Sequence, residues 1–101
     1  MDVIHHIGLP CSNIEETSQW YCNNFNCSIL YKDHDWCMIQ FGNIQLALVN
    51  PEKHSTHIAF EHLLPNMFGI TKRHRDGSVS AYNKDPAGNQ IEYVKIREKR
   101  G

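Results

Sequence analysis

Four side chains that can bind a metal ion stand at related places in the chain: His6, Gln45, His57 and Glu92. Two imidazoles, an amide oxygen and a carboxylate together suit Zn, Ni, Co, Mn or Fe(II). A site of mostly nitrogen and oxygen donors also leaves coordination positions for water or for substrate oxygens. These residue types therefore indicate Lewis-acid chemistry on a small molecule, provided that the fold brings them together.

The sequence repeats itself around these residues. His6–Leu9 and His57–Phe60 both read histidine, isoleucine, small residue and large apolar residue, 51 positions apart (57 minus 6). Later in each half a Gly-Asn turn opens a strand, at Gly42-Asn43 and at Gly88-Asn89. Such self-similarity predicts two related modules. The modules are residues 1–50 and 56–96, within a single domain of residues 1–101.

The first module is predicted to run strand, helix and three strands. Ser12 or Asn13, followed three residues later by a glutamate, is typical of a helix start, and apolar residues then recur at helical spacing to about Asn24. β-rich segments bounded by turn residues predict the strands. These strands are Val3–Leu9, Ser28–Asp33, Trp36–Phe41 and Ile44–Val49.

The second module is predicted to be a shortened copy. Only 18 residues (61–78) separate Phe60 from Val79, so the covering strand and loop are cut down. A short helix is expected within Leu63–Lys72, although Pro65 and Gly69 weaken it. The strands are expected at His57–Phe60, Ser78–Asn83 and Gln90–Ile96. The fold class is α+β.

Strand periodicity places each of the four polar residues on the strand face opposite the large apolar residues. Side chains two positions apart share a face, so His6 lies with Gly8 and His57 with Ala59, while the larger apolar neighbours face away. If the two modules curl toward each other, the four residues converge beside small ones. Taken singly, each has another explanation: a core histidine bonded to backbone, or a Gln or Glu facing solvent. The matching repeat positions favour the metal site.

Composition limits the other possible functions. The formal net charge is -1, so we expect neither nucleic acid nor a membrane as a partner, and the mixed-charge end 95–100 is expected to be solvated. The start of the chain lacks the features of a secretory signal, which favours the cytoplasm. No cysteines form a Cys-x-x-Cys pair, so we expect them to be small buried hydrophobic residues. The remaining histidines are expected at the surface. They are His5, His34, His54, His62 and His74.

The sequence resembles the vicinal oxygen chelate superfamily, which includes glyoxalase I, methylmalonyl-CoA epimerase, extradiol dioxygenases, fosfomycin-resistance proteins and bleomycin-binding proteins. The resemblance extends over nearly the whole chain, and its most specific motif is Asp85–Glu92. It implies paired βαβββ modules, the second shortened here, that form a half-barrel around one divalent ion, usually in a homodimer. The family's ligands fall on His6, Gln45, His57 and Glu92, in an order most similar to the epimerase branch.

Three functions remain open from the sequence. The first is an isomerase, epimerase or lyase in which Glu92 acts as base and a metal-stabilised enolate forms on a small oxygen-chelating substrate. The second is an Fe(II) dioxygenase or a thiol transferase that uses only His6, His57 and Glu92. The third is a non-catalytic protein that binds a small molecule, stacked on Trp20 or Trp36. However, Trp20 lies in the predicted helix, where core packing is the simpler role.

Overall fold

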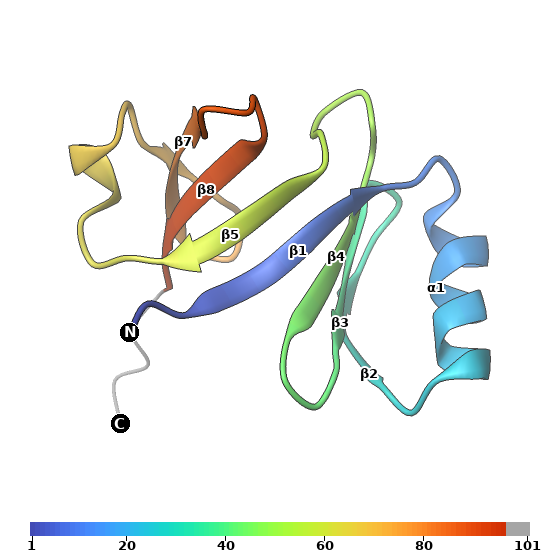
Figure 1. Cartoon of the computed structure of the whole chain (residues 1–101). Helices are drawn as coiled ribbons and strands as arrows, with labels where there is room; N and C mark the ends of the chain where they lie inside the picture. The colour runs from blue at the N-terminus through green and yellow to red at the C-terminus, as the bar shows by residue number, and fades with distance from the viewer. Residues whose placement is uncertain (97–101) are drawn as a thin grey trace. The chain divides into compact units, whose positions relative to one another are not determined.

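The computed structural model describes residues 1–96, so most of the basic end, 97–101, lies outside the described residues. Within them the chain forms eight strands, one α-helix and one 3₁₀ turn (Figure 1). Their order is β1 (Ile4–Pro10), α1 (Ile14–Asn24), β2 (Ser28–Lys32), β3 (Trp36–Gln40), β4 (Gln45–Val49), β5 (His57–Glu61), η1 (Pro65–Met67), β6 (Lys72–Arg73), β7 (Val79–Lys84) and β8 (Gln90–Lys95). This is the α+β class that the sequence predicts.

The chain divides into two compact units. One unit, His6–His57, contains α1 and is called the helical unit below. The other consists of Met1–His5 together with the chain from Ile58 onward and is called the C-terminal unit. Each unit is described by itself.

Strands in the helical unit follow the order β2-β3-β4-β1. β3 is antiparallel to both β2 and β4, whereas β1 and β4 are parallel. Parallel neighbouring strands need a crossover connection, and the connection from β1 to β4 starts with α1. The β1–β4 register starts at His6 opposite Gln45 and ends at Pro10 opposite Val49.

Helix α1 starts and ends where the local signals predict. The Oδ1 of Asn13 accepts a hydrogen bond from the backbone N–H of Glu16 at 3.0 Å, which satisfies one of the donors left open at a helix start. At the other end the N–H of Phe25 donates to the carbonyl of Tyr21 at 2.9 Å. Because the cap and the apolar spacing agree, the predicted helix is confirmed.

The core of the helical unit lies between α1 and its sheet. Ile14 of the helix is buried with Cys37, Ile39 and Leu48 of β3 and β4, and Leu9 packs against this group. Side chains alternate along a strand, so His6 lies on the opposite face of β1 from Leu9. The helix therefore covers the apolar face, and His6 and Gln45 are left on the other, as the alternation predicts.

Strands in the C-terminal unit follow the order β5-β8-β7-β6. β7 and β8 are antiparallel, with Tyr82 opposite Glu92 and Ser80 opposite Val94. The backbone N–H of His62, just after β5, donates to the carbonyl of Val94 at 2.9 Å. Glu92 thus lies in an inner strand, held from both sides.

One predicted element of this unit is wrong. The segment Leu63–Lys72 forms no α-helix; it contains the three-residue turn η1 and then the short strand β6. Pro65 begins a helical turn, but Gly69 follows with φ +152°, a value that L side chains rarely adopt. Phe68 instead stacks flat on Tyr93, with ring centroids 3.9 Å apart. The second module is shortened, as predicted, and its β6 has two residues.

No helix within residues 1–96 is both long enough and apolar enough to cross a bilayer.

Candidate metal centre

Two buried histidines meet in the helical unit. His6 lies on β1 and His57 begins β5; they are 7% and 5% exposed, respectively. Their Nε2 atoms are 3.3 Å apart and their rings are nearly perpendicular, at 87°. Two nitrogens bound at about 2.1 Å to one ion with tetrahedral or octahedral angles stand roughly 3.0–3.4 Å apart. The pair therefore has the spacing of two ligands of a single metal ion.

A backbone contact determines which nitrogen of His57 points at His6. The Nδ1 of His57 lies 2.8 Å from the carbonyl oxygen of Ser55. A carbonyl can only accept, so Nδ1 carries the hydrogen and Nε2 presents its lone pair. The Nε2–H of His6 then donates to the Nε2 of His57. A metal ion would replace that proton and bind both nitrogens.

Gly8 provides the space for this arrangement. A Cβ atom on Gly8 would overlap Cε1 of the His57 ring, and the other two nearest atoms belong to the same imidazole. The sequence predicts that small residues leave room beside the ligands, and at Gly8 the imidazole itself fills the room.

Glu92, the carboxylate among the predicted ligands, lies on β8 in the C-terminal unit. It is 5% exposed, and among residues 1–96 it is the one buried acidic side chain. Its Oε2 accepts a hydrogen bond of 2.6 Å from the hydroxyl of Ser80. Tyr82 lies opposite Glu92 in the β7–β8 register. Burial raises the pKa of Tyr82, and the negative charge of Glu92 raises it further. The Tyr82 side chain therefore remains a neutral phenol.

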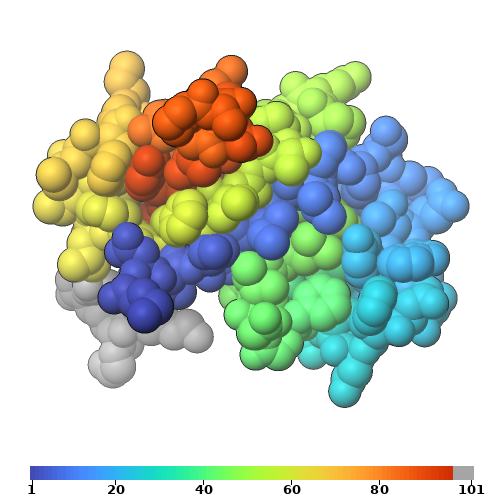
Figure 2. All heavy atoms as spheres, viewed as in Figure 1, coloured from blue at the N-terminus to red at the C-terminus, as the bar shows by residue number. Residues whose placement is uncertain are grey.

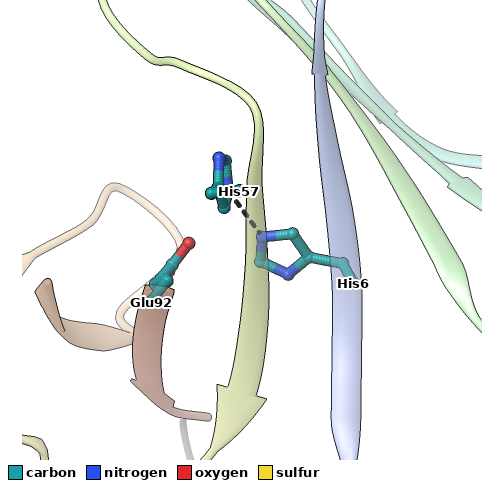
Figure 3. Close-up of side chains that lie close together, drawn as sticks. All are labelled: His6, His57 and Glu92. Carbon is teal, nitrogen blue, oxygen red and sulfur yellow. Dashed lines mark hydrogen bonds between the residues drawn. The ribbon is translucent and has the colours of Figure 1, made fainter. Parts of the chain in front are cut away.

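The donor atoms of His6, His57 and Glu92 all lie within 4.8 Å of one another (Figure 3). Within residues 1–96 this is the one group of three or more His, Cys, Asp or Glu donors with such spacing. Two imidazoles and a carboxylate fit a divalent transition-metal ion.

Known proteins resemble this chain in structure and not in sequence. No protein-family profile matches the sequence, and no curated protein matches it. A hypothetical protein from Bacillus halodurans C-125 superimposes with a TM-score of 0.79 at 12% identity, over 99% of this chain and 98% of the other. A variant of Streptomyces coelicolor methylmalonyl-CoA epimerase, in complex with 2-nitronate-propionyl-CoA, gives 0.77 at 18% identity, over 95% and 98%.

A third structure carries a family description. It is a glyoxalase/bleomycin resistance protein/dioxygenase superfamily member from Vibrio splendidus 12B01, with a TM-score of 0.70 at 9% identity, over 94% of this chain and 98% of the other. The chain has the vicinal oxygen chelate fold. At these identities the likeness shows the fold alone, and the fold that the family resemblance implies is confirmed.

Gln45, the fourth predicted ligand, lies next to His6. The two residues are opposite each other in the parallel pair β1–β4, and Gln45 is half-buried. Directly paired residues of a sheet present their side chains on the same face. The amide is therefore on the histidine side of the sheet. Its role as a ligand stays a prediction.

Two polar residues near Glu92 were missed by sequence reasoning. Ser80 was not singled out, and His74 was expected at the surface, yet the Nε2 of His74 lies 2.9 Å from the hydroxyl of Ser80 and 3.9 Å from Oε2 of Glu92. Finding them needs the register of β7 against β8, which has no local sequence signal. His5, His34, His54 and His62 are outside the donor group.

Trp20 also departs from expectation. It is 54% exposed, with its ring edge-on to Tyr21 at 5.0 Å, so the predicted core packing is wrong.

Proposed function

We propose that the protein is a glyoxalase-like metalloenzyme of the isomerase, epimerase or lyase type. In this proposal His6, Gln45, His57 and Glu92 hold one divalent ion, and Glu92 removes a proton from the carbon next to a substrate carbonyl. The observation that carries the proposal is the buried group of two imidazoles and one carboxylate. Two imidazoles and one carboxylate are a donor set typical of a divalent transition-metal ion.

The ion would act as a Lewis acid, lowering the cost of negative charge on the substrate oxygens as the proton leaves. The protein's own residues supply the rest. His57 is oriented by Ser55 through its Nδ1, and Glu92 is oriented by Ser80 through its Oε2. Oε1 of Glu92 is then the oxygen that would bind the ion loosely and, once the substrate displaces it from the ion, would take the substrate proton and return it.

One buried carboxylate favours one-base chemistry. An enzyme that inverts a centre with two bases needs a second acid or base on the other side of the substrate. Among residues 1–96 Glu92 is the one buried acid. We therefore infer that the same residue removes and returns the proton, as in an isomerisation or an elimination.

The substrate we propose is a small molecule with two oxygens placed to chelate the ion, one of them a carbonyl. Structural neighbours include methylmalonyl-CoA epimerase in complex with methylmalonyl-CoA and NH4+, with a TM-score of 0.73 at 17% identity. Acyl thioesters that carry a second carboxylate, and α-hydroxy thioesters, are therefore the first compounds to screen.

A second function is favoured by the donor group itself. His6, His57 and Glu92 without Gln45 are a two-histidine, one-carboxylate set, which is typical of non-haem Fe(II) oxygenases. Bound iron and oxygen consumption with a catechol would favour this dioxygenase, or a related thiol transferase, over the isomerase.

We also propose that the protein is a homodimer. The segment between β5 and β6 carries large apolar side chains at the surface (Figure 2, yellow to gold). Leu63, Met67 and Ile70 are among them, and Ile70 is 96% exposed. A second copy of the chain would bury these side chains, as the shortened second module leaves no helix to do so.

The first test is elemental analysis of protein purified without a metal-binding tag, beside a His57→Ala control. About one equivalent of Zn, Ni, Co or Mn per chain, lost in the control, supports the isomerase. Iron redirects the work to oxygen chemistry. If the protein holds no metal even after reconstitution with each of these ions, the proposed function is wrong.

A further inference from the structure

A chain of hydrogen bonds within the C-terminal unit leads to one carboxylate oxygen of Glu92. Ser80 Oγ lies 2.6 Å from Oε2 of Glu92, and the Nε2 of His74 lies 2.9 Å from Ser80 Oγ. The hydroxyl of Tyr82 is 3.4 Å from the same nitrogen. Ser80 is fully buried and the His74 side chain is one-quarter exposed. All four residues belong to the C-terminal unit.

Valence determines the direction of this chain. A carboxylate only accepts, so the single hydroxyl hydrogen of Ser80 is donated to Glu92. The oxygen of Ser80 can then only accept from His74, which must carry its hydrogen on Nε2. A hydroxyl that accepts one hydrogen bond becomes a stronger donor in the next, so His74 strengthens the bond from Ser80 to Glu92.

Strand geometry explains why Ser80 reaches this oxygen. Ser80 is paired with Val94 and not with Glu92, so it is the diagonal neighbour of Glu92 on the same face of β7–β8. A short serine beside a long glutamate at this offset meets the outer part of the carboxylate. A serine directly opposite Glu92, at the position of Tyr82, would instead lie beside the base of its side chain.

We propose that Ser80 and His74 are positioning residues that occupy Oε2 of Glu92 and so make Glu92 a one-oxygen metal ligand through Oε1. The inference rests on the proposed metal centre and goes beyond it, because it assigns a coordination mode and two residues that contact neither metal nor substrate. A carboxylate with both oxygens on the ion would use one more coordination position. The hydrogen-bond chain thus keeps that position available to the second oxygen of a chelating substrate.

The test uses Co(II) as the probe, bound to the purified apoprotein of full length. Ser80→Ala removes the hydroxyl, and Ser18→Ala is its matched control. Ser18 is also fully buried, but it lies on α1 and bonds to the carbonyl of Glu15 at 3.1 Å. Two quantities are measured for each variant: the Co(II) affinity by calorimetric titration, and the intensity of the visible d–d absorption, which falls as the coordination number of Co(II) rises.

We expect Ser80→Ala to bind Co(II) 10–100-fold more weakly, the range found for residues that orient a metal ligand. Its d–d absorption should also weaken as Glu92 turns to bind with both oxygens, whereas Ser18→Ala should match the wild type in both quantities. Unchanged affinity and spectrum in Ser80→Ala would overturn the inference while leaving the metal centre intact. Lack of Co(II) binding by the wild type would overturn the inference together with the proposed function.

A second variant covers the case in which Ser80→Ala fails to fold. His74→Phe keeps a ring of similar size at a partly exposed position and removes the Nε2–H donor. We expect a smaller loss of Co(II) affinity, about 3–10-fold, with the same direction of spectral change, because Ser80 remains but is a weaker donor. Affinity and spectrum identical to the wild type in His74→Phe would remove His74 from the proposal. If Ser80→Ala does not fold, an unchanged affinity and spectrum in His74→Phe would overturn the whole inference.

Discussion

Gln45 on β4 lies directly opposite His6 on β1 in a parallel strand pair, and this register places two of the three predicted ligands of the helical unit on one face. The repeated His-Ile motif identifies His6 but not Gln45. The amide is placed by the strand pairing, because a shift of one residue would turn its side chain toward α1. The fourth ligand is thus a consequence of register.

Gln45→Leu should therefore lower the metal affinity and leave the fold intact. The variant removes one oxygen donor of four, and we expect about a 10-fold loss in affinity for Zn(II) in a competition titration. Gln40→Leu is the matched control, since Gln40 is paired with Gln45 on β3 but donates to the carbonyl of Phe41. Equal affinities in the two variants would mean that Gln45 is not a ligand.

Gly8→Ala tests the space behind His57. The added methyl group would overlap the imidazole, so the ring or strand β1 must move. We expect a loss of about 1–3 kcal/mol in the free energy of unfolding by urea, and loss of bound metal. Gly42→Ala is the control, because a Cβ there meets nothing within 4 Å. Retention of both metal and stability in Gly8→Ala would contradict the described packing.

The signals that predicted the site act over short distances. Asn13 with Glu16 begins α1, and the alternation around His6, His57 and Glu92 places these side chains opposite the apolar ones. Neither the three-residue η1 nor the hydrogen bonds that hold the Glu92 carboxylate could be predicted in this way. Helical spacing within Leu63–Lys72 competes with Pro65 and with the φ of Gly69, and the flat stack of Phe68 on Tyr93 takes the place of a helix.

Ser80 and His74 are a different case. Their contacts depend on which residues of β7 and β8 are paired and on the two-residue strand β6, which ends just before His74. The N–H of His74 donates to the carbonyl of Ser78 at 2.8 Å, and this turn aims the imidazole at Ser80. Such pairing is specified by tertiary packing and not by the residues on either side.

The stability of the fold should decrease at alkaline pH because of Cys37. Burial raises the pKa of this thiol from 9.0 to about 11. Between these values the unfolded chain loses the proton while the folded chain keeps it, so the free energy of unfolding falls as the pH rises through this window. Urea denaturation at pH 8 and pH 10.5 measures the slope. Cys37→Ala should have a shallower slope, and an unchanged slope would assign the effect to other groups.

The proposed homodimer should depend on the apolar segment between β5 and β6. Ile70→Asp places a charge where the second copy would pack, so we expect the molar mass measured by light scattering to fall to that of one chain. Leu30→Asp is the control, because Leu30 is also exposed but lies on β2 in the helical unit. A wild-type protein that is monomeric at about 100 μM would show that the segment has another role.

Glu92→Gln separates binding from catalysis. The change keeps the size of the side chain but removes the basic carboxylate. Because His6, Gln45 and His57 remain as ligands, we expect most of the metal to be retained. Exchange of the substrate's α-proton with solvent deuterium, followed by NMR, should fall by about 100-fold or more because general-base catalysis is lost. Metal retention with full exchange would exclude Glu92 as the base, whereas loss of metal would identify it as an indispensable ligand.

The double variant Ser80→Ala, Glu92→Gln tests whether Ser80 acts through Glu92. If Ser80 acts only through Glu92, adding Ser80→Ala to Glu92→Gln should cause no further fall in exchange.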